Sequence, residues 1–554
     1  MKKFYSCLSL VSVIFIILSA NPAHLMGQRQ SAGIPLSIAR ALDPGSVHVY
    51  EVQPPTGDLI REKENSKQLP YRFALSLKAD FSVANSGNTL IAGDGLRVWR
   101  LALRSAGAKA LILYFDRFRL PEGGKLFVYN PSRTILFGAY TSVNENSFGT
   151  FACPLVDGEI VVLEYNAPAS LPLPDIHVSE LSYAFRGIVE YNETDAASGS
   201  GVCEVNVNCS EGNNWQKQKR GVVKIVTKDS TGGSSWCSGS LVNNTNNDGT
   251  PYLLTANHCG VKSRPVDLSQ WLFYFNYEMP GCPNATASTP AVLLGAVLKA
   301  HGGTEYTGSD FYLVRLKETI PDSLHVYFNG WSREDVPSPN GTGVHHPMGD
   351  VKKISTYLSP LVTSYYPQNP NPCFWEVWWN KTANGHGVTE GGSSGSPIFS
   401  SEGLIVGTLT GGNSLCDSAH VNLSDYYGKF SWHWDKNGTD SSKVLKYWLD
   451  PMNTDLMRLG GWALGVEESI SVSDLKLFPN PVSLSASLVV SGVIGEGDAF
   501  TITCTDILGT ICHVPVSELS AGHYLIDTHN LDPGIFFITL TGSTYRKSIK
   551  LVKI

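Results

Sequence analysis

Short apolar runs recur along this chain between Gly, Pro and Asn residues, and stretches with the period of a long helix are scarce. The 53 glycines and 31 prolines supply the turns that such short runs need. Short runs bounded by turn residues are typical of β-strands. The sequence therefore predicts an all-β protein, and its 554 residues are enough for three or four domains of ordinary size.

The N-terminus has the pattern of an export signal. Met-Lys-Lys is followed by an apolar run over 8–19 and by small or polar residues through Gly27. The apolar run is too short to span a bilayer, and no later stretch is long enough. We therefore expect residues 1–27 to be a signal peptide that is cleaved within 20–28, and the mature chain to have no transmembrane segment.

Charge and cysteine usage narrow the class of protein. The formal net charge is −7, charged residues make up 16%, and no basic block suggests nucleic acid as a partner. Eleven cysteines are present, none in a Cys-x-x-Cys pair. In an exported chain this pattern predicts disulfides and argues against a zinc site. We expect neither a metal nor an organic cofactor.

The segment Gly-Gly-Ser-Ser-Gly-Ser-Pro at 391–397 suits a sharp, exposed turn. On such a turn the hydroxyl of Ser394 would be accessible, and the N–H groups of Gly392 and Ser394 would point into one small hole. An acyl-transfer nucleophile needs this combination of an exposed oxygen and preorganised oxyanion donors. Alone, however, a Gly/Ser-rich loop is more often an ordinary turn.

Two upstream segments supply a base and an acid. A short apolar strand over 252–256 leads to His258, and Asp310 stands directly before the apolar run 311–316. Taken singly, each has a simpler interpretation as a structural histidine or a turn aspartate. Together with Ser394 they follow the order His, Asp, Ser, one of the three orders in which the serine triad occurs. We therefore predict that these three residues form a catalytic triad.

These segments resemble the trypsin-like serine proteases in LTANHC at 254–259, GSDFYLVRL at 308–316 and GSSGSP at 392–397. Over 198–460 the chain is most similar to the bacterial lysyl endopeptidases, on GVCEVNVNC, CSGSLVNNT, HHPMGDVKKIS, TEGGSSGSPIFS and NLSDYYGKF. The resemblance implies a protease domain built as a double six-stranded antiparallel β-barrel. It also implies three disulfides, Cys203–Cys416, Cys209–Cys282 and Cys237–Cys259.

Four other cysteines have no assigned partner, namely Cys153, Cys373, Cys504 and Cys512. The last two flank the hairpin turn Asp-Ile-Leu-Gly and could face each other across it.

Specificity depends on a candidate pocket acid. Asp425 in Asn-Leu-Ser-Asp-Tyr-Tyr-Gly matches the pocket aspartate of the lysyl endopeptidases, although a turn cap is the simpler interpretation. A buried carboxylate favours a basic side chain, and the resemblance implies Lys over Arg. Thr410, Gly411 and Gly412 are expected to line the substrate site. The family has His at position 410; a Thr there could instead bond the triad acid, Asp310.

Other candidates near the site are weaker. Asp267 and Asp350 compete as the triad acid, but Asp267 follows His258 too closely and Asp350 suits a turn cap. Three tryptophans precede the nucleophile, and one of them could lie near the cleft, the others being core; they are Trp375, Trp378 and Trp379.

The block over 28–197 is predicted to be a β-sandwich, with strands over 97–103, 110–115, 125–129, 134–140 and 159–165. We expect a propeptide that ends within 191–201; the alternative is an accessory binding domain that the mature protein retains. The nearest basic residue before 198 is Arg186, so self-cleavage after Lys there is unfavourable. Many trypsin-like enzymes have Asp at position 393 to pair with a new N-terminus. Ser393 cannot do so, and we expect maturation without that ion pair.

Residues 466–554 are predicted to form a separate small β-sandwich. The opening Leu-Phe-Pro-Asn-Pro-Val, with LDPGIFFITL and KSIKLVK, resembles the C-terminal sorting domain of type IX secretion cargo in the Bacteroidetes. The resemblance implies the type IX machinery as a partner and a protein that is secreted or attached to the cell surface. A generic carbohydrate-binding or adhesion sandwich is the alternative.

The sequence thus predicts a secreted, monomeric serine endopeptidase that cleaves protein and peptide substrates after Lys. Arg-directed or dual specificity is one alternative, and a non-catalytic protease-like adhesin is the other. An intact Ser, His and Asp set argues against the adhesin, because a binding module does not need all three.

Overall fold

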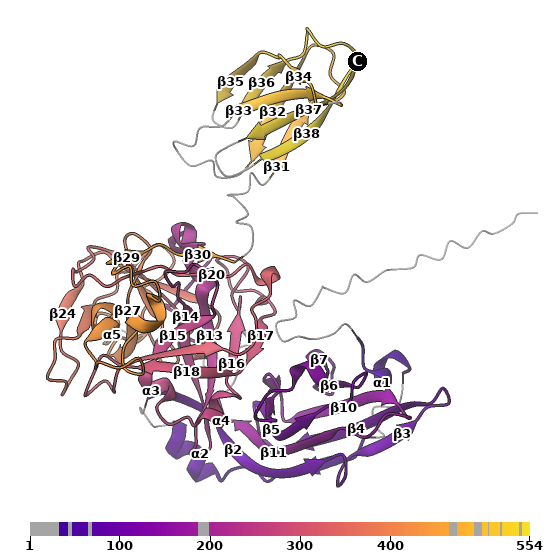
Figure 1. Ribbon diagram of the computed structural model, residues 1–554, viewed down its shortest axis with the longest axis vertical. Helices are drawn as coiled ribbons and strands as arrows, with labels where there is room; N and C mark the ends of the chain where they lie inside the picture. The colour runs from indigo at the N-terminus through magenta and orange to yellow at the C-terminus, as the bar shows by residue number, and fades with distance from the viewer. Residues whose placement is uncertain are drawn as a thin grey trace, which may run out of the picture. The chain divides into compact units, whose positions relative to one another are not determined.

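The computed structural model describes residues 33–41, 47–64, 69–186, 199–417, 419–464, 474–491, 501–507, 509–520, 523–541 and 546–554. The expected signal peptide, 1–27, lies outside these residues, as does most of the expected boundary at 191–201. The chain divides into two compact units, 1–464 and 465–554 (Figure 1). Strands dominate both units, so the prediction of an all-β protein is confirmed.

The N-terminal part of the first unit contains one complete sheet, in the order β1-β4-β10-β6-β7, in which β3 also pairs with β4. Its strands are β1 (Val49–Glu51), β3 (Asn88–Ile91), β4 (Leu96–Arg104), β6 (Lys125–Tyr129), β7 (Leu136–Tyr140) and β10 (Ile160–Pro168). Two short helices, α1 (Leu36–Ala39) and α2 (Gly57–Glu64), flank it in sequence. The strands expected over 97–103, 125–129, 134–140 and 159–165 all fall within this sheet.

A second sheet crosses the expected boundary between the N-terminal block and the protease block. Its main order is β17-β16-β13-β14-β2-β11-β5-β8. The N-terminal block contributes β2 (Tyr71–Ser82), β5 (Ala110–Arg119), β8 (Phe151–Ala152), β9 (Val156–Asp157) and β11 (Asp175–Ala184). The protease block contributes β13 (Val222–Lys228), β14 (Gly233–Leu241), β15 (Tyr252–Ala256), β16 (Leu272–Phe275), β17 (Ala291–Leu294), β18 (Ala296–His301) and β19 (Phe311–Leu316). The link is the antiparallel pair β2–β14, which the sequence did not predict.

The third sheet has the main order β12-β23-β22-β26-β27-β28-β25-β24, with β21 and β29 attached through β27. Its strands are β12 (Val205–Asn206), β21 (Trp331–Ser332), β22 (Gly341–His345), β23 (Lys353–Tyr357), β24 (Val362–Ser364), β25 (Phe374–Val377), β26 (Pro397–Ser400), β27 (Ile405–Gly412), β28 (Asp425–Lys429) and β29 (Arg458–Leu459). A small pair, β20 (Tyr327–Phe328) and β30 (Trp462–Ala463), completes the strands of this part. The helices here are α3 (Asn257–Gly260), α4 (Pro265–Leu268), α5 (Phe430–Asp435) and α6 (Lys446–Leu449).

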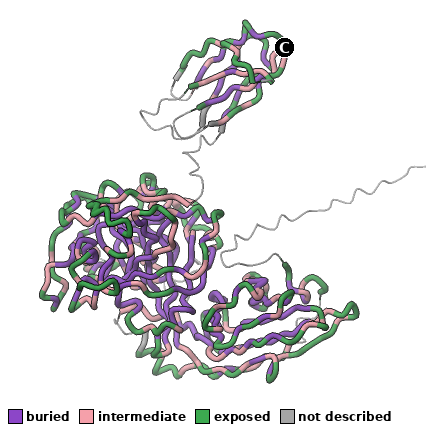
Figure 2. Tube along the Cα trace, in the orientation of Figure 1, coloured by how far each residue is buried: buried purple, intermediate pink, exposed green. Residues whose placement is uncertain are grey.

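The core of this part includes strands that are buried on both faces. β13 (VVKIVTK) and β14 (GSSWCSGSL) are buried along their whole length, although both contain polar residues, so their sequences do not show a buried face alternating with an exposed one. Buried residues lie on these strands and their neighbours and also along the strands of the N-terminal block (Figure 2). His258 follows the end of β15 and Asp310 directly precedes β19, so rigid elements hold these two candidate site residues.

The second unit is built from two sheets, in the orders β31-β32-β36-β35 and β34-β33-β37-β38. The strands are β31 (Asp474–Phe478), β32 (Ser485–Ser491), β33 (Thr501–Asp506), β34 (Ile511–Cys512), β35 (Val516–Ser520), β36 (His523–Asp527), β37 (Gly534–Thr541) and β38 (Arg546–Lys553). Residues from both sheets form one apolar cluster. Cys504 and Cys512 are direct cross-strand partners, and the structure shows both as free thiols.

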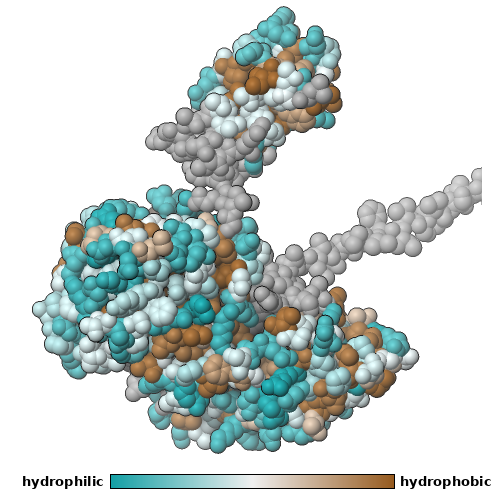
Figure 3. Space-filling view, in the orientation of Figure 1, coloured by the Kyte–Doolittle hydropathy of each residue, from teal (hydrophilic) through white to brown (hydrophobic). Residues whose placement is uncertain are grey.

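On the face seen in Figure 3, apolar residues form separate groups among polar ones. Among the described residues, no helix is long and apolar enough to cross a membrane.

Candidate active site

Strand pairing brings His258 and Asp310 together. β15 ends at Ala256 directly before α3, which carries His258, and Ala256 pairs with Phe311 at the start of β19. The Nδ1 atom of His258 lies 2.7 Å from Oδ2 of Asp310, and the backbone N–H of His258 donates to Oδ1 over 2.9 Å. The Asp310 side chain is fully buried. The carboxylate therefore fixes both the position and the tautomer of the imidazole.

Asp310 has a backbone φ of +58°, in the left-handed region that non-glycine residues rarely adopt. Such a conformation costs about 1–3 kcal/mol and persists only where the surroundings enforce it. Its carbonyl accepts the N–H of Asn257 over 3.1 Å, which ties the strained residue to the helix that carries His258.

His258 is suited to act as a base. Burial lowers its pKa, but the charge of Asp310 and the hydrogen bond to it outweigh burial, so the pKa is raised above the ordinary value of 6.5. Within the described part of the chain, its Nε2 atom has no hydrogen-bond partner. That nitrogen is thus available to accept a proton.

Ser394 lies on the turn between β25 and β26, against the elements that carry His258. Its carbonyl accepts the N–H of Ser238 over 2.8 Å and lies 3.9 Å from the Sγ atom of Cys259, the residue after His258. The structure does not show a hydrogen bond from the Ser394 hydroxyl to His258 Nε2. Catalytic hydrogen bonds are often long without substrate and shorten only in its complex.

The turn also presents two donors for an oxyanion. Gly392 has φ +92°, a conformation that glycine adopts without strain. Ser393 N–H donates to Glu390 O and Gly395 N–H to Leu409 O, which pins the turn on both sides of Ser394. In the described residues neither Gly392 N–H nor Ser394 N–H donates to a protein acceptor. Both predicted oxyanion donors are therefore unoccupied.

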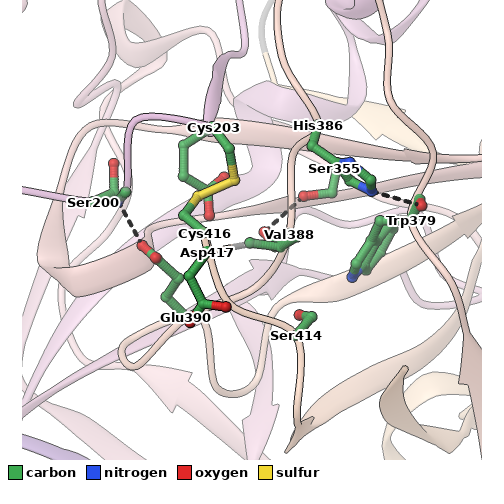
Figure 4. Close-up of a disulfide and its surroundings, with 12 residues drawn as sticks. Ser200, Cys203, Ser355, Trp379, His386, Val388, Glu390, Ser414, Cys416 and Asp417 are labelled. Carbon is green, nitrogen blue, oxygen red and sulfur yellow. Dashed lines mark hydrogen bonds between the residues drawn. A yellow bond between two sulfur atoms is a disulfide. The ribbon is translucent and has the colours of Figure 1, made fainter. Parts of the chain in front are cut away.

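Three disulfides are present in the described residues, and they join the same pairs that the resemblance implies: Cys203–Cys416, Cys209–Cys282 and Cys237–Cys259. Cys237 lies on β14 and Cys259 on α3, so this bridge fixes the helix that carries His258. Figure 4 shows the Cys203–Cys416 bridge next to Glu390, close to the nucleophile turn. Cys153 and Cys373 are buried free thiols.

The candidate pocket acid, Asp425, is buried and has several hydrogen-bond donors. Its Oδ2 atom accepts from Trp379 Nε1 and Thr389 Oγ1, both at 2.7 Å, and from the hydroxyl of Ser414. Among the described residues, its Oδ1 atom accepts a single hydrogen bond, from the N–H of Ser414 at 3.2 Å. Burial raises the pKa of Asp425, and these donors oppose that rise. The Oδ1 atom also faces Gly412, where any side chain would collide with it.

Two sequence expectations about this region need correction or refinement. The Thr410 hydroxyl is buried with no hydrogen-bond partner in the described residues, so the expected bond to Asp310 is not made. Among the tryptophans, Trp379 reaches the pocket acid, whereas Trp375 bonds to the Val406 carbonyl and Trp378 is exposed.

The competing acids do not reach His258. Asp267 pairs with Arg264 at the start of α4, with N–O distances of 2.8 and 2.9 Å. Asp350 accepts the N–H of Val351 and the hydroxyl of Ser200. Both serve as local structural groups.

Sequence reasoning missed two further acids, Glu204 and Glu390, of which Glu390 directly precedes the nucleophile turn. Glu204 is fully buried and neither carboxylate oxygen has a partner in the described residues, while Glu390 accepts the N–H of Gly201 over 2.9 Å. Burial, then the charge of Glu390, raises the pKa of Glu204 well above its ordinary value. Cys416 lies within 4.8 Å of both carboxylates, but its sulfur is in a disulfide and cannot bind a metal.

The start of β2 lies across the candidate substrate site. Tyr71 pairs with Trp236 on β14, and a side chain at position 391 would collide with the Tyr71 ring. Leu69 lines a surface cavity together with Gly411 and Gly412. Residues of the N-terminal block thus touch both the nucleophile turn and the predicted substrate-binding glycines.

A buried imidazole–carboxylate pair, a serine turn and two free oxyanion donors are the chemical groups of an acyl-transfer hydrolase. Residues 197–428 match the family described as Lysyl endopeptidase, C-terminal domain, and residues 476–554 match the Secretion system C-terminal sorting domain. The lysyl endopeptidase of Pseudomonas aeruginosa is 27% identical over 354 residues, which cover 61% of this chain and 74% of that protein.

Solved structures also align with this chain. A Glu endopeptidase in complex with MPD is 14% identical, with a TM-score of 0.25, and the alignment covers 42% of this chain and 92% of that one. HL collagenase is 14% identical, with a TM-score of 0.25, covering 38% and 88%.

The chain is a serine endopeptidase, a peptide-bond hydrolase. Its protease block is similar to the lysyl endopeptidase C-terminal domain over 197–428, and its tail matches a secretion sorting domain, so the protein is secreted or attached to the cell surface. The alternative of a non-catalytic adhesin has no support among these matches.

Proposed function

We propose that this protein cleaves peptide bonds after Lys through an acyl-enzyme formed on Ser394. His258 Nε2 takes the proton of the Ser394 hydroxyl as the oxygen attacks the peptide carbonyl, and it then protonates the leaving amine. Asp310 stabilises the imidazolium form, and the N–H groups of Gly392 and Ser394 bind the oxyanion. Water then attacks the acyl-enzyme by the reverse proton transfers, which releases the second product.

The hydrogen bonding of Asp425 is the observation that carries the specificity for Lys. A guanidinium binds a carboxylate best through two parallel bonds that use both oxygens. Here Oδ2 already accepts three bonds, whereas Oδ1 accepts one long bond. An ammonium, which acts as a point charge, can use a single oxygen. The pocket is therefore better suited to Lys than to Arg.

Paired peptide substrates that differ only in Lys or Arg before the scissile bond test this specificity. The proposal expects kcat/KM to be at least about 100-fold higher for Lys, a difference of about 2.7 kcal/mol in transition-state binding. Comparable rates for both substrates would replace it with the trypsin-like alternative. If a fluorophosphonate labels Ser394 but the protein cleaves neither substrate, the proposed specificity for basic residues is refuted and the proposed triad is not.

We propose further that residues 28–197 are a propeptide, that 198–460 form the protease domain and that 466–554 form the sorting domain, with the processed enzyme a monomer. The propeptide role is supported by Tyr71 against the nucleophile turn and Leu69 beside the substrate-binding glycines. A segment in this place excludes substrate by occupying its site. Latency then comes from steric blockage and not from an unformed active site.

The reaction rate of intact precursor with a fluorophosphonate probe tests the blockage. Intact precursor is expected to react more slowly than processed enzyme, and Tyr71→Gly is expected to accelerate the precursor. Phe81→Gly near the other end of β2 is the matched control, since it weakens the same strand away from the turn. Equal rates for intact and processed enzyme would show that the N-terminal block is an accessory domain.

A further inference from the structure

The residue before the nucleophile is held by a buried histidine. His345, at the end of β22, is fully buried, and its Nδ1 atom lies 2.8 Å from the hydroxyl of Ser393. Its Nε2 atom lies 2.9 Å from the hydroxyl of Ser355 on β23. One imidazole ring therefore connects the nucleophile turn to the β22–β23 hairpin.

The partners of these hydroxyls fix the direction of the bonds. Ser355 donates its proton to the carbonyl of Val388 over 2.9 Å, a bond visible in Figure 4, so its oxygen accepts from His345 Nε2–H. The neutral ring then accepts at Nδ1, and Ser393 donates to it. Ser393 in turn accepts the N–H of Glu390 over 3.2 Å. The result is a directed chain of hydrogen bonds from one end of the turn segment to the other.

The same arrangement recurs beside the candidate acid. His433, on α5, is fully buried; its Nδ1 atom lies 2.8 Å from the hydroxyl of Ser309, and its Nε2 atom lies 2.9 Å from Thr408 Oγ1. The hydroxyl oxygen of Ser309 accepts a hydrogen bond from Asn437 Nδ2 over 2.7 Å, so the hydroxyl proton of Ser309 is available to donate to Nδ1 of His433. Ser309 immediately precedes Asp310, the residue with strained backbone.

We propose that these two bridging imidazoles, His345 and His433, are positioning residues for the catalytic triad. Each holds the serine that precedes a triad residue and anchors it to a strand of the third sheet, β23 for His345 and β27 for His433. The proposal rests on the triad assigned under the proposed function. Neither ring touches the substrate, so both act through the backbone of the residue that follows the bonded serine.

In the nucleophile turn, Ser393 is held by the neutral ring of His345 and not by a charged partner. Burial, then the charge of Lys353, lowers the pKa of His345 to about 3, and the nearest carboxylate, Glu204, lies 4.0 Å from its Nε2 atom. Burial likewise lowers the pKa of His433 to about 3. Both rings are neutral over the range in which His258 can act as a base. The turn with Ser393 is thus held without the ion pair that Asp at this position makes with a new N-terminus.

Paired substitutions separate positioning from simple stability. Asn places an acceptor near the Nδ1 position, and Gln places a donor near the Nε2 position. His345→Asn retains the bond to Ser393, whereas His345→Gln retains only the bond to Ser355. In processed enzyme with active sites counted by titration, His345→Gln is expected to lower kcat about 10- to 100-fold with KM changed less than 3-fold, a fraction of the 10²–10³ lost with an oxyanion donor. His345→Asn is expected to retain activity within about 5-fold of wild type.

The second bridge has its own readout. His433→Gln frees Ser309 and lets Asp310 move, so the pKa of His258 in the pH dependence of kcat/KM is expected to fall, since Asp310 is the main charge that raises it and Glu305 the lesser one. His433→Asn is expected to leave that pKa in place. Val326→Ala, which truncates a fully buried side chain, is the control for lost stability alone.

The outcomes are distinguishable from failure of the triad itself, which wild-type labelling of Ser394 tests separately. The proposal is supported if His345→Gln loses kcat while His345→Asn and Val326→Ala keep it. The variants are compared at the same fraction of folded protein. Equal kcat per active site in all variants, or equal loss in the Asn and Gln variants of both histidines, overturns it.

Discussion

Replacing Asp425 by Asn removes one charge from the pocket and little else. The Asn carbonyl can take the place of Oδ2 and accept the bonds of Trp379, Thr389 and Ser414. The amide nitrogen then faces the Ser414 N–H, whose bond to Oδ1 is already long at 3.2 Å, so the fold loses one weak bond. What a Lys substrate loses is its counter-charge in a buried site.

Truncating one partner of a buried charge pair costs about 2–5 kcal/mol. At about 1.36 kcal/mol per tenfold change, this corresponds to a loss of about 30-fold to about 5,000-fold in kcat/KM for a Lys substrate. The substrate with norleucine in place of Lys is the internal control, because it fills the pocket without a charge. Its kcat/KM is expected to change less than about 5-fold, and the melting temperature by only a few degrees.

The assay compares Lys and norleucine peptides on wild-type enzyme and on Asp425→Asn, with active sites titrated. The variant is expected to lose most of the preference for Lys. If the Lys-to-norleucine ratio stays within about 3-fold of wild type, another acid binds the ammonium and the pocket assignment is refuted.

Three other expectations follow from the same geometry. Because the pKa of His258 is raised by Asp310 despite burial, and the base must be neutral, kcat/KM is expected to fall as the pH drops through a value above 6.5, which a pH–rate profile measures. Burial raises the pKa of Glu204, so its ionisation opposes folding as the pH rises; Glu204→Gln is expected to add about 1–3 kcal/mol to the free energy of unfolding at pH 8 and little at pH 4, by calorimetry. Replacing Cys237 and Cys259 by Ser removes a bridge between residues 22 apart and is expected to cost about 3 kcal/mol in urea unfolding, with a lower kcat. The first expectation is contradicted if replacing Asp310 leaves the pH–rate profile unchanged. The second is contradicted if Glu204→Gln lowers the free energy of unfolding at pH 8, and the third if the double Ser variant unfolds at the same urea concentration as wild type.

Local sequence patterns predicted many of the strands. The runs before His258 and after Asp310 are short, apolar and bounded by turns, and they form β15 and β19 as such runs do. Antiparallel pairing of these two strands then brings the ends that bear the two residues together. The motif order was sufficient to name His258 and Asp310 because each stands next to the end of a rigid strand, β15 or β19.

Long-range pairing and side-chain direction were not accessible in the same way. The pair β2–β14 joins Tyr71 to Trp236 across more than 160 residues, and nothing local in either segment indicates its partner. The sequence gives no reason to choose among the three neighbouring tryptophans, Trp375, Trp378 and Trp379. The structure shows that Trp379 bonds to Asp425. Trp375 lies on β25, whereas Trp378 and Trp379 follow the end of that strand.

Buried polar groups were the other gap. A histidine within an apolar segment gives no sign of its partners, so His345 and His433 were not expected to bridge hydroxyls. From the sequence, the hydroxyl of Thr410 could bond Asp310, yet it has no hydrogen-bond partner in the described residues. Hydrogen-bond networks depend on positions at a scale of a few tenths of an ångström, which residue order does not specify.

The central claim is that His258 activates the hydroxyl of Ser394. A fluorophosphonate probe applied to the processed enzyme, followed by peptide mass spectrometry, tests it most directly. The account predicts a single adduct on the peptide that contains Ser394, lost on His258→Ala in enzyme that retains its melting temperature. An adduct on another residue, or full labelling of Ser394 in the His258→Ala variant, would contradict it.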